Sequence, residues 1–188
     1  YIPASLPELK ELDLSYSKQL KDISWLAGSK KLHKLNLNNC YTLRNIETLS
    51  NLTGLRYLSL SNCKSITDIG CLSSLKKLKW LNIRYCKSIK DFQPLTGLKN
   101  LKVLYIGEVV NEIDLGKLPN LNILSMPYAS EIEDIDSLSA MTDLTELDLS
   151  NCKKLRNLDG LANLTDIVDI DISECWSLEN LDGLANCM

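Results

Sequence analysis

The sequence lacks the features on which most catalytic and membrane functions depend. It has one histidine and no apolar run close to the ~20 residues that a membrane-spanning helix requires. It has no Cys-x-x-Cys pair and no glycine-rich phosphate loop, so neither a zinc site of the usual spacing nor a phosphate-binding loop is predicted. The net charge of −3 gives no overall basicity of the kind that argues for nucleic acid. We therefore expect no cofactor, no bound metal and no membrane insertion.

What the sequence has instead is an internal repeat. The pattern Leu-x-x-Leu-x-Leu occurs eight times, at steps of 23 residues except for one step of 20. The copies begin at Leu9, Leu32, Leu55, Leu78, Leu101, Leu121, Leu144 and Ile167. A fixed period of this size predicts a solenoid, in which each repeat buries its apolar face only against its neighbours. We expect a single domain over residues 1–188, a fragment of a longer protein because it opens at Tyr1 and ends within a repeat.

The apolar spacing changes within each repeat, which we number from its first leucine. Positions 4 and 6 alternate with polar residues and predict a short strand. Positions 12, 15, 18 and 21 are apolar at intervals of three, which predicts a 3₁₀ or short helical return segment. Position 14 is Asp or Asn and is expected to bind nearby backbone and cap a turn. Its members are Asp22, Asn45, Asp68, Asp91, Asp134, Asn157 and Asn180.

The repeat that begins at Leu101 is three residues shorter than the others. Either Asn111 or Glu112 must stand in for its position-14 residue, and Leu115 and Leu118 restore the frame. We expect a tighter return loop there and a local bend of the array.

Five of the seven cysteines fall at position 9: Cys40, Cys63, Cys86, Cys152 and Cys175. We expect these thiols to point inward, to bond loop backbone and to be inert, because burial raises a thiol pKa. The total number of cysteines is odd, and most of them share one repeat position, which does not resemble a disulfide framework. The pattern favours a reducing, cytoplasmic compartment. The alternative is the cell surface or secretion, in which case the glycosylation patterns at Asn51 and Asn163 become sites for glycans.

These columns resemble the leucine-rich-repeat superfamily, and the resemblance covers essentially the whole chain. The segment Asp22-Ile-Ser-Trp-Leu26 is similar to the short class found in the phosphatase-1 regulatory subunit and in bacterial internalins. The segment Asn62-Cys-Lys-Ser-Ile-Thr-Asp-Ile69 is similar to leucine-rich-repeat proteins of kinetoplastid parasites. The resemblance implies an α/β fold, a right-handed solenoid with a concave parallel sheet of about eight strands. It implies 3₁₀, short helical and irregular segments on the convex side.

The side chains at positions 3, 5, 7 and 8 are predicted to point away from the core, onto the concave face. Six of the eleven aromatic residues fall there, although the leucine columns suffice for the core. Trp, Tyr and Arg dominate interface hot spots, so we predict a partner site in the middle of the array. The alternative is that neighbouring rings only stack along the strands and stay in water. The predicted site comprises Tyr57, Trp80, Arg84, Tyr85, Val103, Tyr105, Glu108, Ile123, Tyr128, Asp148 and Asp171.

Charge is distributed unevenly at the edges of this face. In the last two repeats Asp148 and Asp171 should be neighbours roughly 5 Å apart, a repulsive pair from which folding gains nothing. They predict the binding of a basic segment of a partner, with a solvated acidic rim or a bound cation as alternatives. Position 2 is basic and is most simply a solvated face, with an acidic partner or an RNA backbone as the alternative. Its members are Lys10, His33, Arg56, Lys79 and Lys102. The net acidity counts against nucleic acid.

No Ser–His–Asp or Cys–His set can be assembled around the single histidine, so enzymatic activity is not predicted. The leading hypothesis is a monomeric, intracellular module that binds another protein on its concave face. Within a longer chain it could select clients or regulators for a signalling, ubiquitin-ligase or phosphatase assembly. The alternatives are a cell-surface adhesin of the internalin kind, which binds a host receptor, and a structural spacer.

Overall fold

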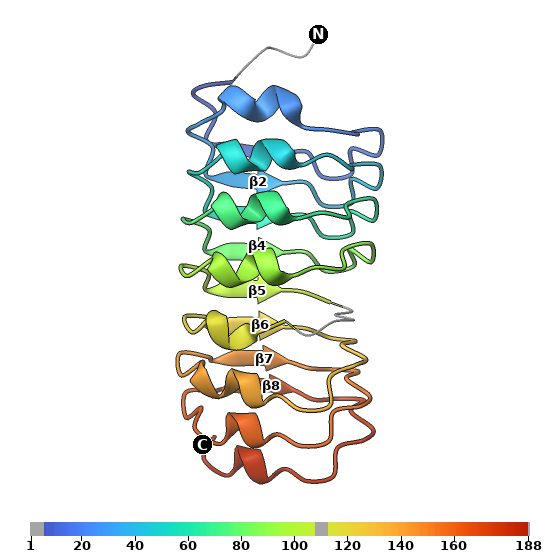
Figure 1. Ribbon diagram of the computed structural model, residues 1–188, viewed down its shortest axis with the longest axis vertical. Coiled ribbons are helices and arrows are strands. Elements are labelled where there is room, and N and C mark those ends of the chain that lie inside the picture. The colour runs from blue at the N-terminus through green and yellow to red at the C-terminus, as the bar shows by residue number, and fades with distance from the viewer. Residues whose placement is uncertain (1–5, 108–112, 188) are drawn as a thin grey trace. The chain divides into compact units, whose positions relative to one another are not determined.

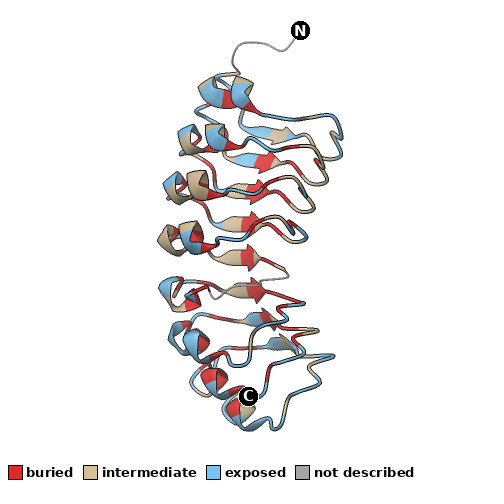
Figure 2. Cartoon of the chain, turned by 45° about the vertical axis from the view of Figure 1, so that its right-hand side comes forward, coloured by how far each residue is buried: buried red, intermediate tan, exposed pale blue. Residues whose placement is uncertain are grey.

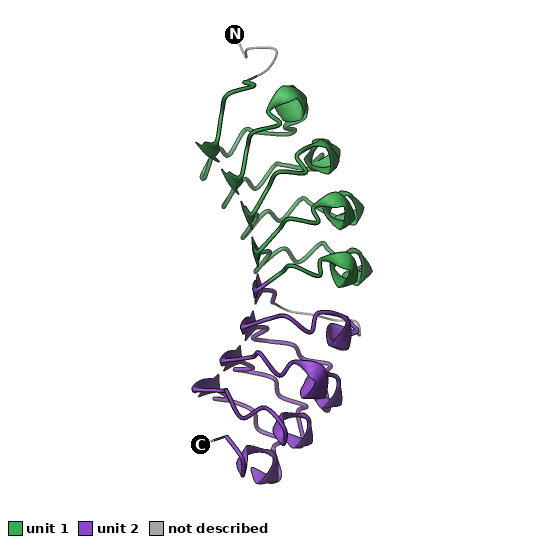
Figure 3. Ribbon diagram, turned by 90° about the vertical axis from the view of Figure 1, so that its left-hand side faces the viewer, with its two compact units in different colours: residues 1–101 green, residues 102–188 purple. Residues whose placement is uncertain are grey.

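The computed structural model describes residues 6–107 and 113–187 and divides the chain into two compact units, residues 1–101 and 102–188 (Figures 1 and 3). Each unit is a stack of repeats, and in each the strands lie on one side and the 3₁₀ helices on the other (Figure 3). The prediction of a single domain stays a prediction.

The first unit contains four parallel strands in register. The position-3 residues of adjacent strands are paired: Glu11 with Lys34, Lys34 with Tyr57, and Tyr57 with Trp80. The strands are β1 (Glu11–Asp13), β2 (Lys34–Asn36), β3 (Tyr57–Ser59) and β4 (Trp80–Asn82). The return segments are η1 (Ser24–Gly28), η2 (Glu47–Asn51), η3 (Gly70–Ser74) and η4 (Gln93–Gly97). All four return segments are 3₁₀ helices, as the spacing of three predicts.

The second unit repeats this arrangement. Its strands pair in parallel with Val103 opposite Ile123, Ile123 opposite Glu146 and Glu146 opposite Asp169. They are β5 (Val103–Tyr105), β6 (Ile123–Ser125), β7 (Glu146–Asp148) and β8 (Asp169–Asp171). The 3₁₀ helices are η5 (Leu115–Lys117), η6 (Asp136–Ala140), η7 (Asp159–Leu161) and η8 (Asp182–Leu184). The predicted repeat solenoid, with parallel strands and 3₁₀ return segments, is confirmed.

The core of each unit is built from columns of leucine. Leu35, Leu58 and Leu81 at position 4 are fully buried, as are Leu49 and Leu72 on the 3₁₀ side. Figure 2 shows that buried residues recur in successive repeats, along the strands, the 3₁₀ helices and the segments between them. A three-residue strand buries only one side chain toward the core, so a single repeat cannot fold alone and its stability depends on stacking.

Position 14 closes the turn that leads into every 3₁₀ helix except η5, whose position-14 residue lies outside the described residues. Its side-chain oxygen accepts a hydrogen bond from the backbone N–H two residues later, as in Asp68 to Gly70 at 2.7 Å and Asn45 to Glu47 at 3.0 Å. The same bond forms at Asp22, Asp91, Asp134, Asn157 and Asn180. The predicted structural role of this column is therefore confirmed.

The position-9 thiols form a ladder across the repeats. Each Sγ donates to the position-6 carbonyl of the preceding repeat, as in Cys63 to Leu37 and Cys86 to Leu60, both at 3.0 Å. Equivalent bonds join Cys40 to Leu14, Cys152 to Met126 and Cys175 to Leu149. Four of the five cysteines are buried, and Cys175 is half-buried. The expectation that these thiols bond loop backbone is confirmed.

The short repeat contains the shortened return segment η5, of three residues, where the repeats on either side have five. Leu115 and Leu118 are buried and restore the frame as predicted. Asn111 and Glu112, the candidate substitutes at position 14, lie outside the described residues. The predicted local bend stays a prediction, although the boundary between the units falls at the start of this repeat.

We predict that the ladder thiols are protected from reagents in the folded protein. Burial raises the pKa of Cys86 to about 11 and of Cys152 to about 12, so neither supplies thiolate near neutral pH. Labelling with iodoacetamide at mildly alkaline pH, followed by mass spectrometry, should leave both unmodified until urea unfolds the chain. Rapid labelling of Cys86 in the native protein would contradict the ladder geometry.

We also predict that Gly160 cannot be replaced by alanine without a large loss of stability. A Cβ atom there would lie 2.0 Å from the backbone oxygen of Ile135 in the preceding repeat. Overpacking of this kind costs about 1–3 kcal/mol in the free energy of unfolding, measurable by urea denaturation. Gly97→Ala is the matched control, because the only close neighbour of its Cβ would be the Nζ of Lys76 at 2.9 Å, the end of a flexible, exposed side chain. An equal effect of both substitutions would show that the contact does not matter.

Candidate functional site

The predicted site residues fall into two groups, one in each unit. The first unit holds Tyr57, Trp80, Arg84 and Tyr85. The second unit holds Val103, Tyr105, Ile123, Tyr128, Asp148 and Asp171, and Glu108 lies outside the described residues. The expectation of one continuous strip through the middle of the array therefore stays a prediction.

In the first unit, β3 and β4 present a stacked aromatic pair. The rings of Tyr57 and Trp80 have centroids 4.0 Å apart and an interplanar angle of 12°. Lys34, on the other side of β3, places its Nζ 5.6 Å from the centre of the Tyr57 ring. Both aromatic residues are half-buried, and the stack covers one face of each ring. The pair forms a compact apolar step on the strand face.

A different constraint acts at position 8, just after each strand. The backbone there is left-handed in seven repeats, with φ between 59° and 62°. Asparagine, which occupies this position as Asn39, Asn62 and Asn151, adopts the left-handed conformation readily. Tyrosine, found there as Tyr85 and Tyr128, adopts it far less readily. A left-handed residue other than Gly, Asn or Asp costs about 1 kcal/mol. These tyrosines are also 46% and 47% exposed, so neither backbone preference nor core packing accounts for them.

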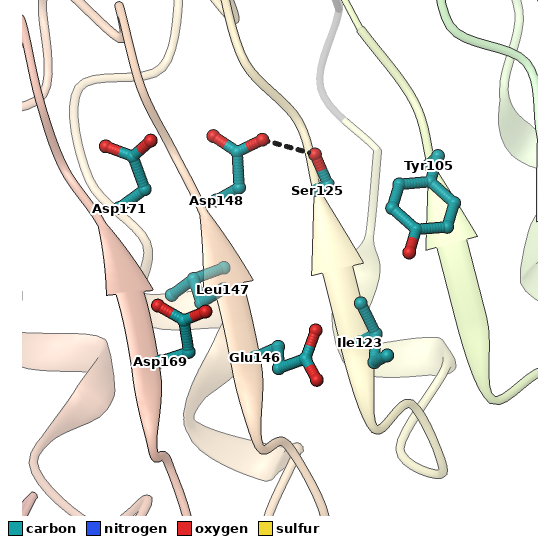
Figure 4. Close-up of a pocket in the computed structure, with 8 residues that line it drawn as sticks. All are labelled: Tyr105, Ile123, Ser125, Glu146, Leu147, Asp148, Asp169 and Asp171. Carbon is teal, nitrogen blue, oxygen red and sulfur yellow. Dashed lines mark hydrogen bonds between the residues drawn. The ribbon is translucent and has the colours of Figure 1, made fainter.

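In the second unit, the strand face carries a small hollow over β5 to β8 (Figure 4). Its wall is apolar on one side, at Tyr105 and Ile123, and acidic on the other. The remaining lining residues are Ser125, Glu146, Leu147, Asp148, Asp169 and Asp171. The hollow has a volume of about 90 Å³. Small-molecule sites usually measure ~300–1,000 Å³, so this one fits a single side chain of a partner better than a cofactor.

Two of these carboxylates have structural roles that the sequence analysis missed. Asp148 accepts hydrogen bonds from the backbone N–H of Ser150 at 3.1 Å and from the Ser125 hydroxyl at 2.6 Å. Asp171 accepts from the backbone N–H of Ser173 at 2.9 Å. Hydrogen bonds from the side chain and backbone of Ser173 lower the pKa of Asp171. The two aspartates are register neighbours as predicted, but the expectation that folding gains nothing from them is wrong.

The structural role of Asp148 and Asp171 is common to most residues at position 5. Its Asp or Asn side chain turns back onto the backbone N–H two residues later, closing the turn after the strand. The bond recurs in four repeats besides that of Asp148, at Asp13, Asn36, Asn82 and Asp171. A recurrence of Asp and Asn at position 5 was the available signal. Among the hydrogen bonds of the described residues, none of this kind is formed by Glu146 and Asp169, the position-3 carboxylates of β7 and β8 that line the hollow.

The charge of the chain is strongly divided between the units, which the small net charge conceals. Residues 1–101 contain 16 Lys and Arg against 7 Asp and Glu, a net charge of +9. Residues 102–188 contain 5 against 17, a net charge of −12. The net acidity of the whole chain therefore does not count against nucleic acid as a ligand of the first unit. A count of charges by halves of the sequence was the signal that could have revealed this.

Within residues 6–107 and 113–187, no group of three or more His, Cys, Asp or Glu is placed to hold a metal ion. None of the helices described is long and apolar enough to cross a membrane. Position 2, which includes His33, lies at the entry to the strands, away from the ladder thiols.

Known structures share the fold. Internalin C2 of Listeria monocytogenes aligns with a TM-score of 0.83 and 23% identity, over 97% of this chain and 78% of that one. InlJ of the same organism, whose functional domain includes a cysteine ladder, aligns at 0.53 and 20%, over 94% and 49%. The leucine-rich-repeat ectodomain of the Arabidopsis receptor kinase HAESA, bound to a peptide hormone, aligns at 0.57 and 21%, over 85% and 33%. At these identities the likeness establishes the fold alone.

Sequence families give a closer assignment. Residues 1–70 match the Zer-1-like leucine-rich repeats, and no curated protein matches the chain. Residues 48–175 match the family described as plant disease resistance protein RPS2-like, leucine-rich repeats, which covers more than half of the sequence. With the repeat period, the parallel strands and the 3₁₀ return segments, this match shows that the chain belongs to the leucine-rich-repeat family, a fold that serves as a protein-interaction module.

Proposed function

We propose that this chain is a non-enzymatic recognition module that binds other proteins on the outward face of its strands. The observation that carries the proposal is the Tyr57–Trp80 stack, which lies on that face while the leucine columns complete the core without it. Aromatic side chains of this size supply most of the binding energy at protein interfaces. The left-handed, exposed Tyr85 supports the same assignment, because its backbone conformation favours Asn.

In the second unit the proposed ligand is a basic segment. Its Lys or Arg side chain would enter the hollow beside Tyr105 and Ile123 and meet the carboxylates of Glu146 and Asp169. Among the described residues, no ion pair includes either carboxylate. A cation would therefore relieve repulsion between register neighbours instead of displacing an existing partner. Asp148 and Asp171 add to the negative potential from their turn positions.

The compartment we propose is a reducing one, with the module acting as a monomer within an intracellular assembly. Supporting this, all seven cysteines are free and five of them form the thiol ladder. Recognition of clients or regulators for a signalling, phosphatase or ubiquitin-ligase assembly fits such a surface. The internalin neighbours keep an adhesin role as the second candidate. In that case the exposed Asn51 and Asn163 are proposed glycan sites.

The aromatic proposal predicts loss of partner binding when both rings are removed. Tyr57→Ala with Trp80→Ala should weaken capture of specific partners by about thirtyfold or more, because even one hot-spot truncation costs ~2 kcal/mol or more. The measurement is quantitative affinity capture with mass spectrometry. Trp176→Ala is the control, since Trp176 is 72% exposed and lies outside the strand face. Undiminished capture by a folded double variant would refute the assignment.

The acidic proposal predicts a selective loss of binding to basic peptides. Glu146→Gln with Asp169→Asn should weaken binding of an Arg- and Lys-rich peptide several-fold, more strongly at low ionic strength. Fluorescence anisotropy measures this directly. Asp159→Asn with Asp182→Asn removes the same charge from η7 and η8 and should have little effect. If both pairs weaken binding equally, only the net charge of the unit matters and the hollow is not a site.

A further inference from the structure

A row of basic side chains lies at the entry to the strands of the first unit. Position 2 places Lys10, His33, Arg56 and Lys79 in consecutive repeats. The backbone N–H groups of His33, Arg56 and Lys79 each donate a 2.9 Å hydrogen bond to the carbonyl of the preceding member of the row. These bonds fix the four residues in register. Neighbouring strands are ~4.8 Å apart, so the row extends about 15 Å. We call these four residues the basic row.

The basic row is not neutralised within its own unit. Among the described residues, no ion pair includes Lys10, Arg56 or Lys79, and all three are exposed. Lys102, at the same position in the second unit, is paired with Asp143 at 3.3 Å. Like charges in adjacent register destabilise a sheet, and the unit already has a net charge of +9. The leucine core gains nothing from this arrangement.

We propose that the basic row binds an acidic helix of a partner protein, laid along the array beside the Tyr57–Trp80 step. The spacing supports a helix. Carboxylates at i, i+3, i+7 and i+10 share one helical face and rise ~4.5, 10.5 and 15 Å from the first. The row repeats at about 4.8, 9.6 and 14.4 Å, so each carboxylate lies within ~1 Å of a row member along the axis. Three of these members are cations, and the fourth, His33, offers a ring N–H as a hydrogen-bond donor. Apolar side chains flanking the acidic face then meet the two rings.

The same geometry disfavours nucleic acid as the ligand. Bases bind proteins by stacking on free aromatic faces. Trp80 covers one face of Tyr57, and Lys34 lies over the ring from the other side of β3. The phosphates of one strand of a duplex recur every ~3.4 Å along its axis, which does not match the row. A helix needs only the outer edges of the rings and one cation for each turn.

The test uses a helix-forming peptide of about 18 residues with Glu at i, i+3, i+7 and i+10. A peptide of the same composition with its Glu residues on different faces is the control ligand. Fluorescence anisotropy should show tighter binding of the first peptide. Arg56→Glu with Lys79→Glu should raise its Kd by about tenfold or more. Lys21→Glu with Arg44→Glu changes the same charge at exposed, neighbouring sites beyond the strands and should raise the Kd less than about twofold.

Several outcomes would overturn the proposal. Equal binding of the two peptides would exclude register recognition, and equal effects of the two charge reversals would reduce the binding to net charge. Tighter binding of a single-stranded oligonucleotide, lost on reversal of Arg56 and Lys79, would make the ligand a nucleic acid. A dimer that dissociates on the same reversal would make it a second copy of this chain. If the reversed protein unfolds, Arg56→Gln with Lys79→Gln tests the same contacts without new repulsion.

This inference goes beyond the proposed function, since it concerns an edge of the first unit that the aromatic assignment does not include. The two can fail separately. Loss of partner capture on removal of the rings, with no binding of the acidic peptide, refutes only the basic row. Binding of the acidic peptide that survives Tyr57→Ala with Trp80→Ala supports the row alone.

Discussion

The register between repeats is the constraint on which the rest of this structure depends. The inner repeats of the array bury a leucine from the strand and another from the 3₁₀ helix, and each repeat satisfies its strand backbone only by pairing with a neighbouring repeat. Pairing at a fixed offset places every residue beside the residue at the same position one repeat away. A favourable contact is therefore multiplied along the array, and so is an unfavourable one.

The polar columns show how this multiplication is used. A buried thiol can donate a hydrogen bond to the backbone carbonyl that is left open at the bend. Because the repeats pair at a fixed offset, the same thiol–carbonyl bond forms in the repeat of Cys40 and in that of Cys175. Asp or Asn at position 14 closes a turn by bonding its own backbone, so no member depends on a neighbour's side chain. Identical polar side chains can therefore lie next to one another in successive repeats when each has its own hydrogen-bond partner in the backbone. Unpaired charges such as Arg56 and Lys79 lack that satisfaction.

The parts of the fold that could be predicted are those in which periodicity alone determines the environment. Leucines, ladder thiols and position-14 residues recur at fixed spacing, and each has one physically reasonable role. The Asp148 turn was missed because an aspartate on a strand face reads as a free charge, and only backbone geometry shows that it caps its own turn. The left-handed backbone at Tyr85 was hidden for a related reason, since tyrosine is a poor indicator of that conformation.

The division of charge remains the feature that folding explains least. Solubility requires only that net charge differ from zero, which interspersed charges achieve at lower electrostatic cost. Here cations accumulate in one unit and carboxylates in the other, and register brings like charges together within each. Ligands of opposite sign would relieve the resulting repulsion, and the same fields would steer such ligands and repel others. A chain with two such surfaces is suited to hold one basic and one acidic segment, whether of two partners or of one.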